Sequence, residues 1–363
     1  MERKYVLVIN PGSTSTKIAI YDGFEKKAQE NLTHETSELE KYEKITDQYE
    51  YRKEMIVDWL NAKGYEPSKL KAVVGRGGLL RPMPSGTYKV TEPMIQDLII
   101  GYQGEHASNL GGMIAGAIAK GEGIEAYIVD PVAVDEFEEV ARISGMPQIK
   151  RKSLLHALNI KAIAHSVAND KNCKVEDLNM IIAHLGGGIS VVPLLKGKMI
   201  DANNANEMGP FSPERTGNLP VGDLTKMCFS GEYTNADMKK KLRGKGGMTA
   251  YLGTNDAREV LKMIESGDEH AKLIFEAMGY QIAKEIGAMA TVLHGKVDAV
   301  VLTGGVAYSK YLTDYIESHV SFIAPVILKP GEDEMEALNE GVQRVLNGDE
   351  QAKIYEEEVE IND

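Results

Sequence analysis

The stretch VLVINPGSTSTKIAIYD, residues 6–22, decides the fold of this chain. Four consecutive apolar residues, 6–9, are typical of a strand that is buried on both faces. The next eight residues are small or polar, and a second β-branched run follows at residues 18–21. The sequence therefore predicts a strand, a hydroxyl-rich turn and a returning strand at the start of the chain.

The turn between these two strands carries groups that suit a phosphate. Gly12 lets the backbone approach a ligand closely, the hydroxyls of residues 13–16 offer donors, and Lys17 offers a positive charge. The turn is not a P-loop, because the second glycine and the Gly-Lys-Ser/Thr ending are missing. A cluster of serine and threonine between strands is also an ordinary polar hairpin tip. From this turn alone, the two interpretations are about equally good.

Length and composition predict a soluble globular protein of two domains. The chain has 363 residues, of which 43% are hydrophobic and 26% are charged. A net charge of −13 argues against nucleic acid or an anionic membrane as a partner. Cys173 and Cys228 are isolated, which excludes a disulfide framework. No apolar run has the length of a membrane span, and charged residues lead from Met1 straight into a strand. We therefore expect no signal peptide and a cytoplasmic location.

Hydrophobic periodicity and turn residues predict the other elements. Helices are expected at residues 37–64, 105–119, 132–142, 154–168, 256–265, 269–293 and 334–346, and strands at residues 72–74, 126–129, 180–183, 189–195 and 299–302. Ser37 and Glu40 have capping-box spacing, and Gly64 is a natural helix stop. Residues 201–223 predict a long ordered loop, and the acidic tail after Asp349 is expected to be frayed.

The second half of the chain repeats the first in outline. Residues 180–195 again place a small turn, His184-Leu185-Gly186, between an apolar run and a β-rich run, as Asn10-Pro11-Gly12 does earlier. AVVGRGG at residues 72–78 matches AVVLTGG at residues 299–305 at five of seven positions. The two repeated motifs are offset by 174 and 227 residues. The second half therefore carries about 53 extra residues between its turn motif and its heptapeptide. This pattern predicts two α/β halves with an insertion in the second.

A duplicated α/β fold whose halves each open with strand, phosphate loop and strand resembles the superfamily of actin, hexokinase, chaperone ATPases and acetate kinase. Four motifs resemble those of acetate kinases, in order and over nearly the whole chain. They are the first phosphate motif NPGSTSTK at 10–17, the second phosphate motif HLGGG at 184–188, the catalytic arginine loop ERTGNLP at 214–220 and the adenosine motif LTGGVAYSK at 302–310. The variants GRGGLLRPMPSGTY at 75–88 and Pro11 resemble butyrate kinases and branched-chain fatty-acid kinases.

The resemblance implies a fold of the α/β class with two duplicated ribonuclease H-like, actin-like ATPase domains and an interdomain cleft that closes on substrates. Residues 1–129 with 330–363 would form the N-terminal lobe, and residues 130–329 the nucleotide-binding lobe with a helical insertion. The implied reaction is ATP + butanoate = ADP + butanoyl phosphate by direct in-line transfer, with ATP/ADP and Mg²⁺. The implied partners are a small-molecule carboxylate, a nucleotide and further copies of the chain in a homodimer or higher homo-oligomer.

The implied site residues suit this chemistry. A carboxylate acceptor is already anionic near neutrality, so the site has to supply cations rather than a strong base. By similarity Arg76 binds the acid, Arg215 neutralises the transferring phosphoryl group, His156 donates a hydrogen bond, and Asp130 orients the acceptor or holds Mg²⁺. Asn10 and one acid of residues 332–334, with Glu334 favoured, would approach the metal. The implied nucleotide-binding residues are Ser13, Thr14, Ser15, Lys17, His184, Gly186, Gly187, Gly188, Asp256, Arg258, Gly304 and Gly305.

Each of these residues also has an ordinary structural interpretation. Arg76 and Arg215 would by default be surface arginines, and His156 a structural histidine. Asp130, which precedes a proline, is commonly a turn or capping residue. A run of three glycines is usually a flexible turn, and acids in the first turn of a helix favour its dipole. The presence of all the motifs together favours the functional interpretation.

The resemblance implies that three residues, each smaller than its counterpart in acetate kinases, set the substrate length. Gly78, Ala107 and Leu155 stand where acetate kinases have bulkier valine, leucine and phenylalanine, so a wider pocket is expected. A buried methylene contributes only about 0.8 kcal/mol, so neighbouring acids should overlap as substrates. Ser108 replaces the histidine that precedes the asparagine of acetate kinases, here Asn109. Isobutyrate, propionate or acetate kinase activity and a non-catalytic, nucleotide-switched actin-like protein are the alternatives. The apolar pocket disfavours a sugar kinase.

Overall fold

The computed structural model describes residues 3–360, which fold as two compact units. Unit 1 comprises Met1–Asp135, Ala157–Ala162 and Asp333–Asp363, and unit 2 comprises Glu136–His156 and Ile163–Glu332. Met1, on which the expectation of no signal peptide rests, and the last three residues lie outside the described part. Within residues 3–360, no helix combines the length and the apolar character that crossing a bilayer needs.

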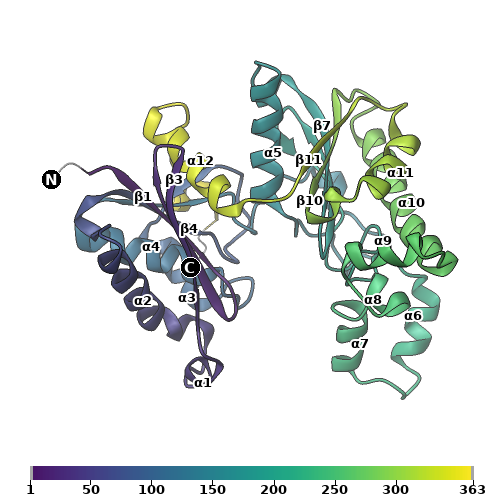
Figure 1. Ribbon diagram of the computed structural model, residues 1–363, viewed down its shortest axis with the longest axis horizontal. Helices are drawn as coiled ribbons and strands as arrows, with labels where there is room; N and C mark the ends of the chain where they lie inside the picture. The colour runs from purple at the N-terminus through teal and green to yellow at the C-terminus, as the bar shows by residue number, and fades with distance from the viewer. Residues whose placement is uncertain (1–2, 361–363) are drawn as a thin grey trace. The chain divides into compact units, whose positions relative to one another are not determined.

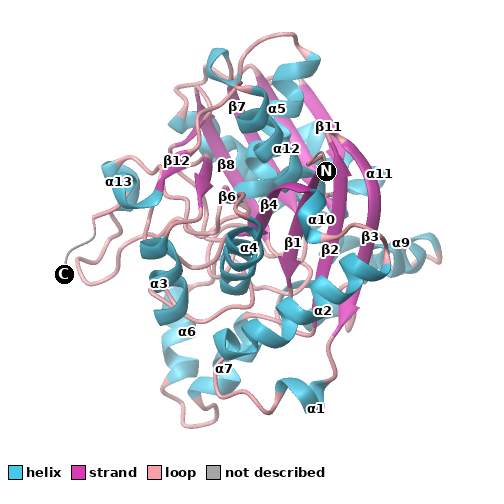
Figure 2. Ribbon diagram, turned by 90° about the vertical axis from the view of Figure 1, so that its left-hand side faces the viewer, coloured by secondary structure: helices cyan, strands magenta, loops and turns pink. Residues whose placement is uncertain are grey.

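Unit 1 is built on a mixed sheet with strand order β12-β5-β6-β4-β1-β2-β3. Strand β1 runs antiparallel to β2 and parallel to β4, and β4 runs parallel to β6. The side chains of residues 6–9 are all 0% exposed, which confirms a strand buried on both faces. Figure 2 shows β1, β2 and β3 side by side. The strands are β1 (Tyr5–Pro11), β2 (Ser15–Asp22), β3 (Glu25–Thr33), β4 (Leu70–Arg76), β5 (Thr87–Lys89), β6 (Glu125–Val129) and β12 (Lys353–Ile354).

Helices cover both faces of this sheet. Helices α2 (Tyr49–Ala62) and α4 (Asn109–Glu122) bury Ile56 and Ile114 in the same cluster as Leu7 and Ile9 of β1. Helix α12 (Glu334–Asn347) lies on the other side of the sheet from α2 and α4 (Figure 1). It buries Leu338 and Val342 against the alternate β1 residues Val6 and Val8. The period of two along β1 therefore fixes which helix covers which face. The remaining helices of unit 1 are α1 (Thr36–Leu39), α3 (Glu92–Ile100) and α13 (Tyr355–Glu358).

Unit 2 repeats this plan with strand order β11-β10-β7-β8-β9. Its strands are β7 (Asn179–Leu185), β8 (Ile189–Leu195), β9 (Lys198–Met199), β10 (Ala299–Gly304) and β11 (Val326–Pro330). Its core joins these strands to the long helix α10 through Phe275, Met278 and Ile282 and to α11 through Leu312. Its helices are α6 (Val221–Cys228), α7 (Asn235–Leu242), α8 (Gly247–Leu252), α9 (Ala257–Glu265), α10 (Glu269–Val292) and α11 (Lys310–Val320), and α5 (Ala157–Asp170) contributes to both units.

The strand pairing confirms the internal duplication. The order β6-β4-β1-β2-β3 in unit 1 corresponds to β11-β10-β7-β8-β9 in unit 2. Strand β7 is antiparallel to β8 and parallel to β10, and β10 is parallel to β11, as in the first half. The matching heptapeptides therefore lie on equivalent strands, β4 and β10. The extra residues of the second half fall between β9 and α10, where α6 to α9 are found.

Two predicted helices and one predicted capping box differ from the structure. Residues 132–138 are not helical, because Met83 pairs with this segment through its backbone and accepts a hydrogen bond from Asp135 N at 2.9 Å. The predicted helix at 37–64 is interrupted between α1 and α2, where Asp47 caps the backbone N–H of Lys44 at 3.0 Å and starts a new turn. The expected capping box at Ser37 does not form, although Gly64, with φ +77°, does end the second part.

The acidic tail is ordered as far as residue 360, so the expectation of a frayed end is wrong. Strand β12 pairs with β5, and Tyr355 is 0% exposed. The hydroxyl of Tyr355 donates to the Asp97 carboxylate at 2.8 Å. One aromatic residue in an acidic segment therefore anchors the tail, since its burial and its hydrogen bond outweigh the surrounding charge.

Candidate functional site

Three adjacent parallel strands of unit 1 bring predicted site residues to one edge of the sheet. Asn10 lies near the end of β1, Arg76 ends β4, and Asp130 directly follows β6. The register pairs Ile9 with Gly75 and Arg76 with Val129, so the three residues lie within one step of each other along the strands. The carboxyl ends of parallel strands are where α/β folds place their ligands.

The carboxylate of Glu334 joins Asn10 and Arg76. Asn10 Nδ2 donates to Glu334 Oε2 at 2.6 Å, and Arg76 Nη1 forms an ion pair with Glu334 Oε1. The side chains of Arg76 and Glu334 are 19% and 32% exposed, so the pair borders solvent. The guanidinium is thus placed to hold a carboxylate, which is the task predicted for it.

The acids beside Glu334 have other partners. Asp333 caps α12 by accepting from Glu336 N at 3.0 Å and pairs with Lys26 at 2.9 Å. Glu332 belongs to unit 2, where its carboxylate lies 3.3 Å from His184 Nε2. The contact with Asn10 therefore distinguishes Glu334 from its neighbours and supports its choice as the acid near a metal.

The Asn10–Glu334 pair fits a magnesium ion that arrives with a nucleotide. An amide oxygen and one carboxylate are hard oxygen donors, and Mg²⁺ commonly takes only one or two protein ligands beside phosphates and water. The described part of the chain contains no group of three or more His, Cys, Asp or Glu residues that could hold a metal ion. A set of one amide and one carboxylate suits a metal that phosphates and water also bind.

Asp130 holds a neighbouring turn. Its Oδ1 accepts from Gly86 N at 2.8 Å, and its own N–H donates to Gly86 O at 3.1 Å. The residue has φ +38° and is 5% exposed. Burial raises the pKa of this carboxyl to about 6, although Lys161 and the Gly86 N–H act in the opposite direction. These contacts favour an orienting role over direct metal binding.

The substitution Asp130→Asn is expected to stabilise the protein above pH 6. The carboxyl binds its proton more tightly in the folded state than at its ordinary value of 3.8, so stability should fall as pH rises from about 4 to about 6. Asp130→Asn keeps an oxygen for the Gly86 N–H and should gain about 1–3 kcal/mol at pH 7.5. Urea unfolding at pH 4.5 and 7.5 measures this gain, with exposed Asp58→Asn as the control. A large loss of stability at both pH values would contradict this account.

The first phosphate loop exposes its polar groups. Gly12 N donates to Ser15 O at 2.7 Å and closes the turn between β1 and β2. Ser13, Thr14 and Lys17 are exposed, and within residues 3–360 Lys17 forms no ion pair. A hydroxyl-rich loop with an uncommitted lysine suits an anionic ligand.

His106 is a residue of interest that the sequence analysis missed. Its Nδ1 lies 2.8 Å from Ser108 Oγ and accepts from Ser108 N at 3.2 Å. Burial lowers the pKa of this partly exposed imidazole, and the positive charge of Arg76 lowers it further. His106 is therefore a neighbour of Arg76. Ser108 is the residue that holds the His106 ring, a link that only a structure can reveal.

Gly78 does not widen the acid-binding pocket as the sequence comparison suggested. A Cβ added at Gly78 would lie 2.3 Å from Asn109 Oδ1 and 2.6 Å from Asn109 Cα, so this glycine permits close packing and opens no space. Asn109 in turn accepts from Leu79 N at 2.9 Å. Ala107 and Leu155 are buried, in unit 1 and unit 2 respectively, and the substrate-length prediction depends on these two residues.

In unit 2 the second glycine loop lies under Arg215. Gly186 N donates to Gly188 O at 3.2 Å between β7 and β8. A Cβ on Gly188 would lie 2.1 Å from Arg215 Nη1, so only glycine leaves room for the guanidinium there. Arg215 Nη1 also donates to Ala205 O at 2.8 Å, and burial, followed by the charge of Arg243, lowers the arginine's pKa. The structure thus places Arg215 on the predicted phosphate loop.

His156 and His184 form a stacked pair in unit 2. Their ring centroids are 4.0 Å apart with an interplanar angle of 19°. Burial lowers the pKa of His184 well below its usual value, and the neighbouring His156 adds to this effect. His156 Nδ1 lies 2.9 Å from Ser190 Oγ of β8. His184 is therefore neutral at pH 7, and the two predicted histidines lie together at the base of the second loop.

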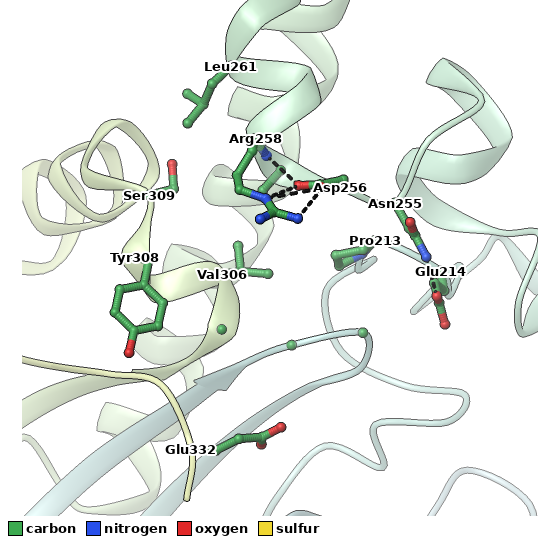
Figure 3. A pocket seen from close by; sticks show the side chains of 14 residues that line it. Pro213, Glu214, Asn255, Asp256, Arg258, Leu261, Val306, Tyr308, Ser309 and Glu332 are labelled. Atoms are coloured by element: carbon green, nitrogen blue, oxygen red, sulfur yellow. Dashed lines mark hydrogen bonds and ion pairs between the residues drawn. The ribbon is translucent and has the colours of Figure 1, made fainter. Parts of the chain in front are cut away.

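A pocket of about 640 Å³ opens beside this loop (Figure 3). Asp256 and Arg258 approach it from the start of α9, and Val306 and Tyr308 approach it from the segment after β10. Of the predicted nucleotide-binding residues, those that line it are Gly186, Gly187, Asp256, Arg258 and Gly305. Its size and its mixture of apolar and charged groups suit a nucleotide.

Local contacts explain the Asp256–Arg258 pair of this pocket and also Gly304, the residue before Gly305. Arg258 donates to the Asp256 carboxylate, with Nη2 at 2.6 Å from Oδ2, and these hydrogen bonds lower the pKa of Asp256 to about 2. Gly304 has φ +88°, and a Cβ there would lie 2.4 Å from Leu185 O. The fold therefore accounts for Gly304, whereas Gly305 has open space beside it.

Comparison with known proteins places these features in a family. A model of the acetokinase family matches residues 148–323. The chain is 57% identical over 350 residues to a protein named probable butyrate kinase 2 from Caldanaerobacter subterraneus subsp. tengcongensis, with 96% of this chain and 99% of that protein covered. It is 55% identical over 351 residues to butyrate kinase 2 of Clostridium acetobutylicum, with the same coverage.

The fold is that of solved acetate kinase structures. The acetate kinase of Porphyromonas gingivalis superposes with a TM-score of 0.78 at 20% identity, covering 94% of this chain and 100% of the other. This likeness and the duplicated sheets confirm the predicted α/β class with two actin-like domains. The full-length similarity settles the family as well. The chain belongs to the acetokinase family.

Proposed function

We propose that this chain uses ATP to phosphorylate butyrate, giving butyryl phosphate and ADP. The full-length similarity to two proteins named butyrate kinase carries the choice of substrate. The chemistry of the site supports it independently. Arg76 already pairs with a carboxylate, two loops suit phosphates, and the adjoining pocket has the size of a nucleotide site.

The acid is bound through unit 1 in this proposal. Arg76 holds the carboxylate of butyrate, which is ionised at neutral pH, so no base has to remove a proton. A carboxylate oxygen forms the new bond to the γ-phosphorus of ATP. The bond from that phosphorus to the β–γ bridging oxygen breaks, and ADP leaves with the electron pair. The charge of Arg76 lowers the repulsion between the acid and the polyphosphate.

The nucleotide is bound chiefly through unit 2. The pocket beside Asp256 and Val306 holds the adenosine, and the glycine loop at residues 186–188 supports the phosphates. Arg215 stabilises the charge on the phosphoryl group during transfer, and His156 supplies a further hydrogen bond. When bound, Mg²⁺ near Asn10 and Glu334 would neutralise phosphate charge. The predicted homo-oligomer and the cytoplasmic location stay predictions.

Trapping the acyl phosphate with hydroxylamine tests the substrate. The purified protein with ATP and Mg²⁺ should form most hydroxamate with butyrate or isobutyrate, less with propionate and valerate, and least with acetate. The differences should be modest, since one methylene is worth about 0.8 kcal/mol. A maximum at acetate would overturn the proposed acid but keep the chemistry. Absence of hydroxamate with all five acids, despite ATP binding, would overturn the proposed function in favour of a nucleotide switch.

A further inference from the structure

Arg52 is a buried cation directly behind the first phosphate loop. It lies in the first turn of α2, is 0% exposed, and heads the fully buried side chains in size. Nothing in the proposed chemistry uses it. A charged side chain without solvent contact costs several kcal/mol unless its surroundings compensate for the lost water, so its partners should explain why it is there.

The guanidinium of Arg52 is bound to the backbone of the loop. Nη1 donates to Gly12 O at 2.8 Å, to Ser15 O at 3.3 Å and to Thr16 Oγ1 at 3.1 Å. Nη2 donates to Ser13 O at 2.9 Å. Gln48 Oε1 accepts from Nη2 at 2.7 Å and from Nε at 3.1 Å. Within residues 3–360, none of these partners is a carboxylate, so the positive charge is held by neutral oxygens alone.

The arginine remains charged at neutral pH. Burial lowers the pKa of Arg52 only to about 10. His34, whose Nε2 lies 2.8 Å from Thr16 Oγ1, stays neutral, because burial and the charge of Arg52 lower its pKa to about 4. The network of Arg52, Gln48, Thr16 and His34 therefore carries one positive charge and no negative one. A side chain that only filled space would not need this charge.

The hydrogen bonds to Arg52 also set the direction of two peptide groups. In a trans peptide the C=O and the N–H point in opposite directions, and the described chain contains no cis bond. Because the carbonyls of Gly12 and Ser13 point at Arg52, the N–H groups of Ser13 and Thr14 point away from it. In the described part of the chain these two N–H groups have no acceptor, and both residues are exposed. Successive outward N–H groups form a site for an anion.

We propose that Arg52 is a positioning residue that turns the Ser13 and Thr14 peptide N–H groups toward the phosphate chain of ATP and places a positive charge behind them. This inference rests on the proposed function, which assigns the loop to the nucleotide. It explains why the buried group is an arginine: a planar fork with five donors binds three carbonyls, a hydroxyl and an amide at once, which a lysine cannot do.

Arg52→Lys tests the proposal, because it keeps the charge but loses the fork. Binding of ATP and of AMP is measured by calorimetry, beside kcat/KM for ATP and the melting temperature. We expect ATP affinity to fall at least about tenfold, AMP affinity to change less than about twofold, and kcat/KM to fall about 100-fold, as small misplacements of binding groups do. The control is Arg81→Lys. Arg81 belongs to the same unit and pairs with Asp97 at 2.7 Å, so it should lose stability but keep the ratio of ATP to AMP affinity.

Equal weakening of ATP and AMP by Arg52→Lys, or a lower melting temperature with unchanged binding, would overturn the inference. If Arg52→Lys does not fold, Gln48→Met serves instead, since it removes the acceptor of Nε and one of the two acceptors of Nη2 and leaves the charge in place. It should weaken ATP about threefold more than AMP, and an unchanged ratio would overturn the inference. The wild-type enzyme separates this result from the proposed function: failure to form butyryl phosphate refutes the function, whereas the affinity ratio concerns Arg52 alone.

Discussion

Replacing Arg76 by alanine should lower the rate of butyryl phosphate formation about 10³-fold, because a charge-assisted pair with a carboxylate is worth about 4 kcal/mol and 1.36 kcal/mol corresponds to a factor of ten. ATP binding should change less than about threefold, since the nucleotide pocket belongs to unit 2 and Arg76 to unit 1. The melting temperature should change little, because Arg76 and Glu334 border solvent and such pairs add little stability.

Initial rates at varied butyrate and calorimetric titration with ATP separate these effects. Arg76→Lys is the matched variant, because it keeps the charge but gives up planar, two-point binding, and its loss should be smaller. Arg3→Ala is the control, since this arginine donates to the backbone of Glu122 and Gly123 on an exposed surface. Equal loss of catalysis and ATP binding in Arg76→Ala would contradict the role assigned to Arg76.

Replacing Arg215 by alanine should lower kcat by about 10³-fold or more, as removal of an arginine that stabilises a transferring phosphoryl group does. The affinity for ATP in the ground state should fall much less, because this charge acts mainly as the bonds change. The structure supports the assignment through position: the guanidinium lies against Gly188 on the second glycine loop.

Gly188→Ala offers an independent test of the same contact. Its Cβ would lie 2.1 Å from Arg215 Nη1, and the end of a flexible side chain can move aside at little cost in stability. The guanidinium would then be displaced without being removed, and kcat should fall about 100-fold. Gly222→Ala, in α6 with open space beside it, is the control. A Gly188→Ala enzyme with wild-type kcat would show that the position of Arg215 is not important for transfer.

The sequence predicted those parts of the fold that local patterns encode. The buried run at residues 6–9, the paired strands after each loop and the equivalence of β4 with β10 are confirmed, because apolar runs and small turns leave a direct signal. The helix expected at 132–142 does not form over residues 132–138, because Met83, 51 residues before Val134, pairs with the backbone of that segment. The expectation for the tail is wrong for a similar reason, since Tyr355 packs in the core of unit 1 and bonds Asp97, contacts that charge content does not reveal.

The residues of the candidate site also fall into those that a local motif predicts and those that only the structure reveals. Motifs pointed to Asn10, Arg76 and Glu334, and the structure adds that Glu334 contacts both of the others, although it is 324 residues from Asn10 in the chain. Gly78 shows the opposite case: a missing side chain suggested space, whereas Asn109 fills it. Arg52 and His106 escaped notice because their importance depends on partners that no short motif contains.

Following the reaction by ³¹P NMR distinguishes a butyrate kinase from an ATPase. With ATP, Mg²⁺ and butyrate, we expect butyryl phosphate to appear in step with ADP, and we expect the omission of butyrate nearly to stop ADP formation. Appearance of ADP with inorganic phosphate at the same rate, whether or not butyrate is present, would contradict this expectation and identify an ATPase.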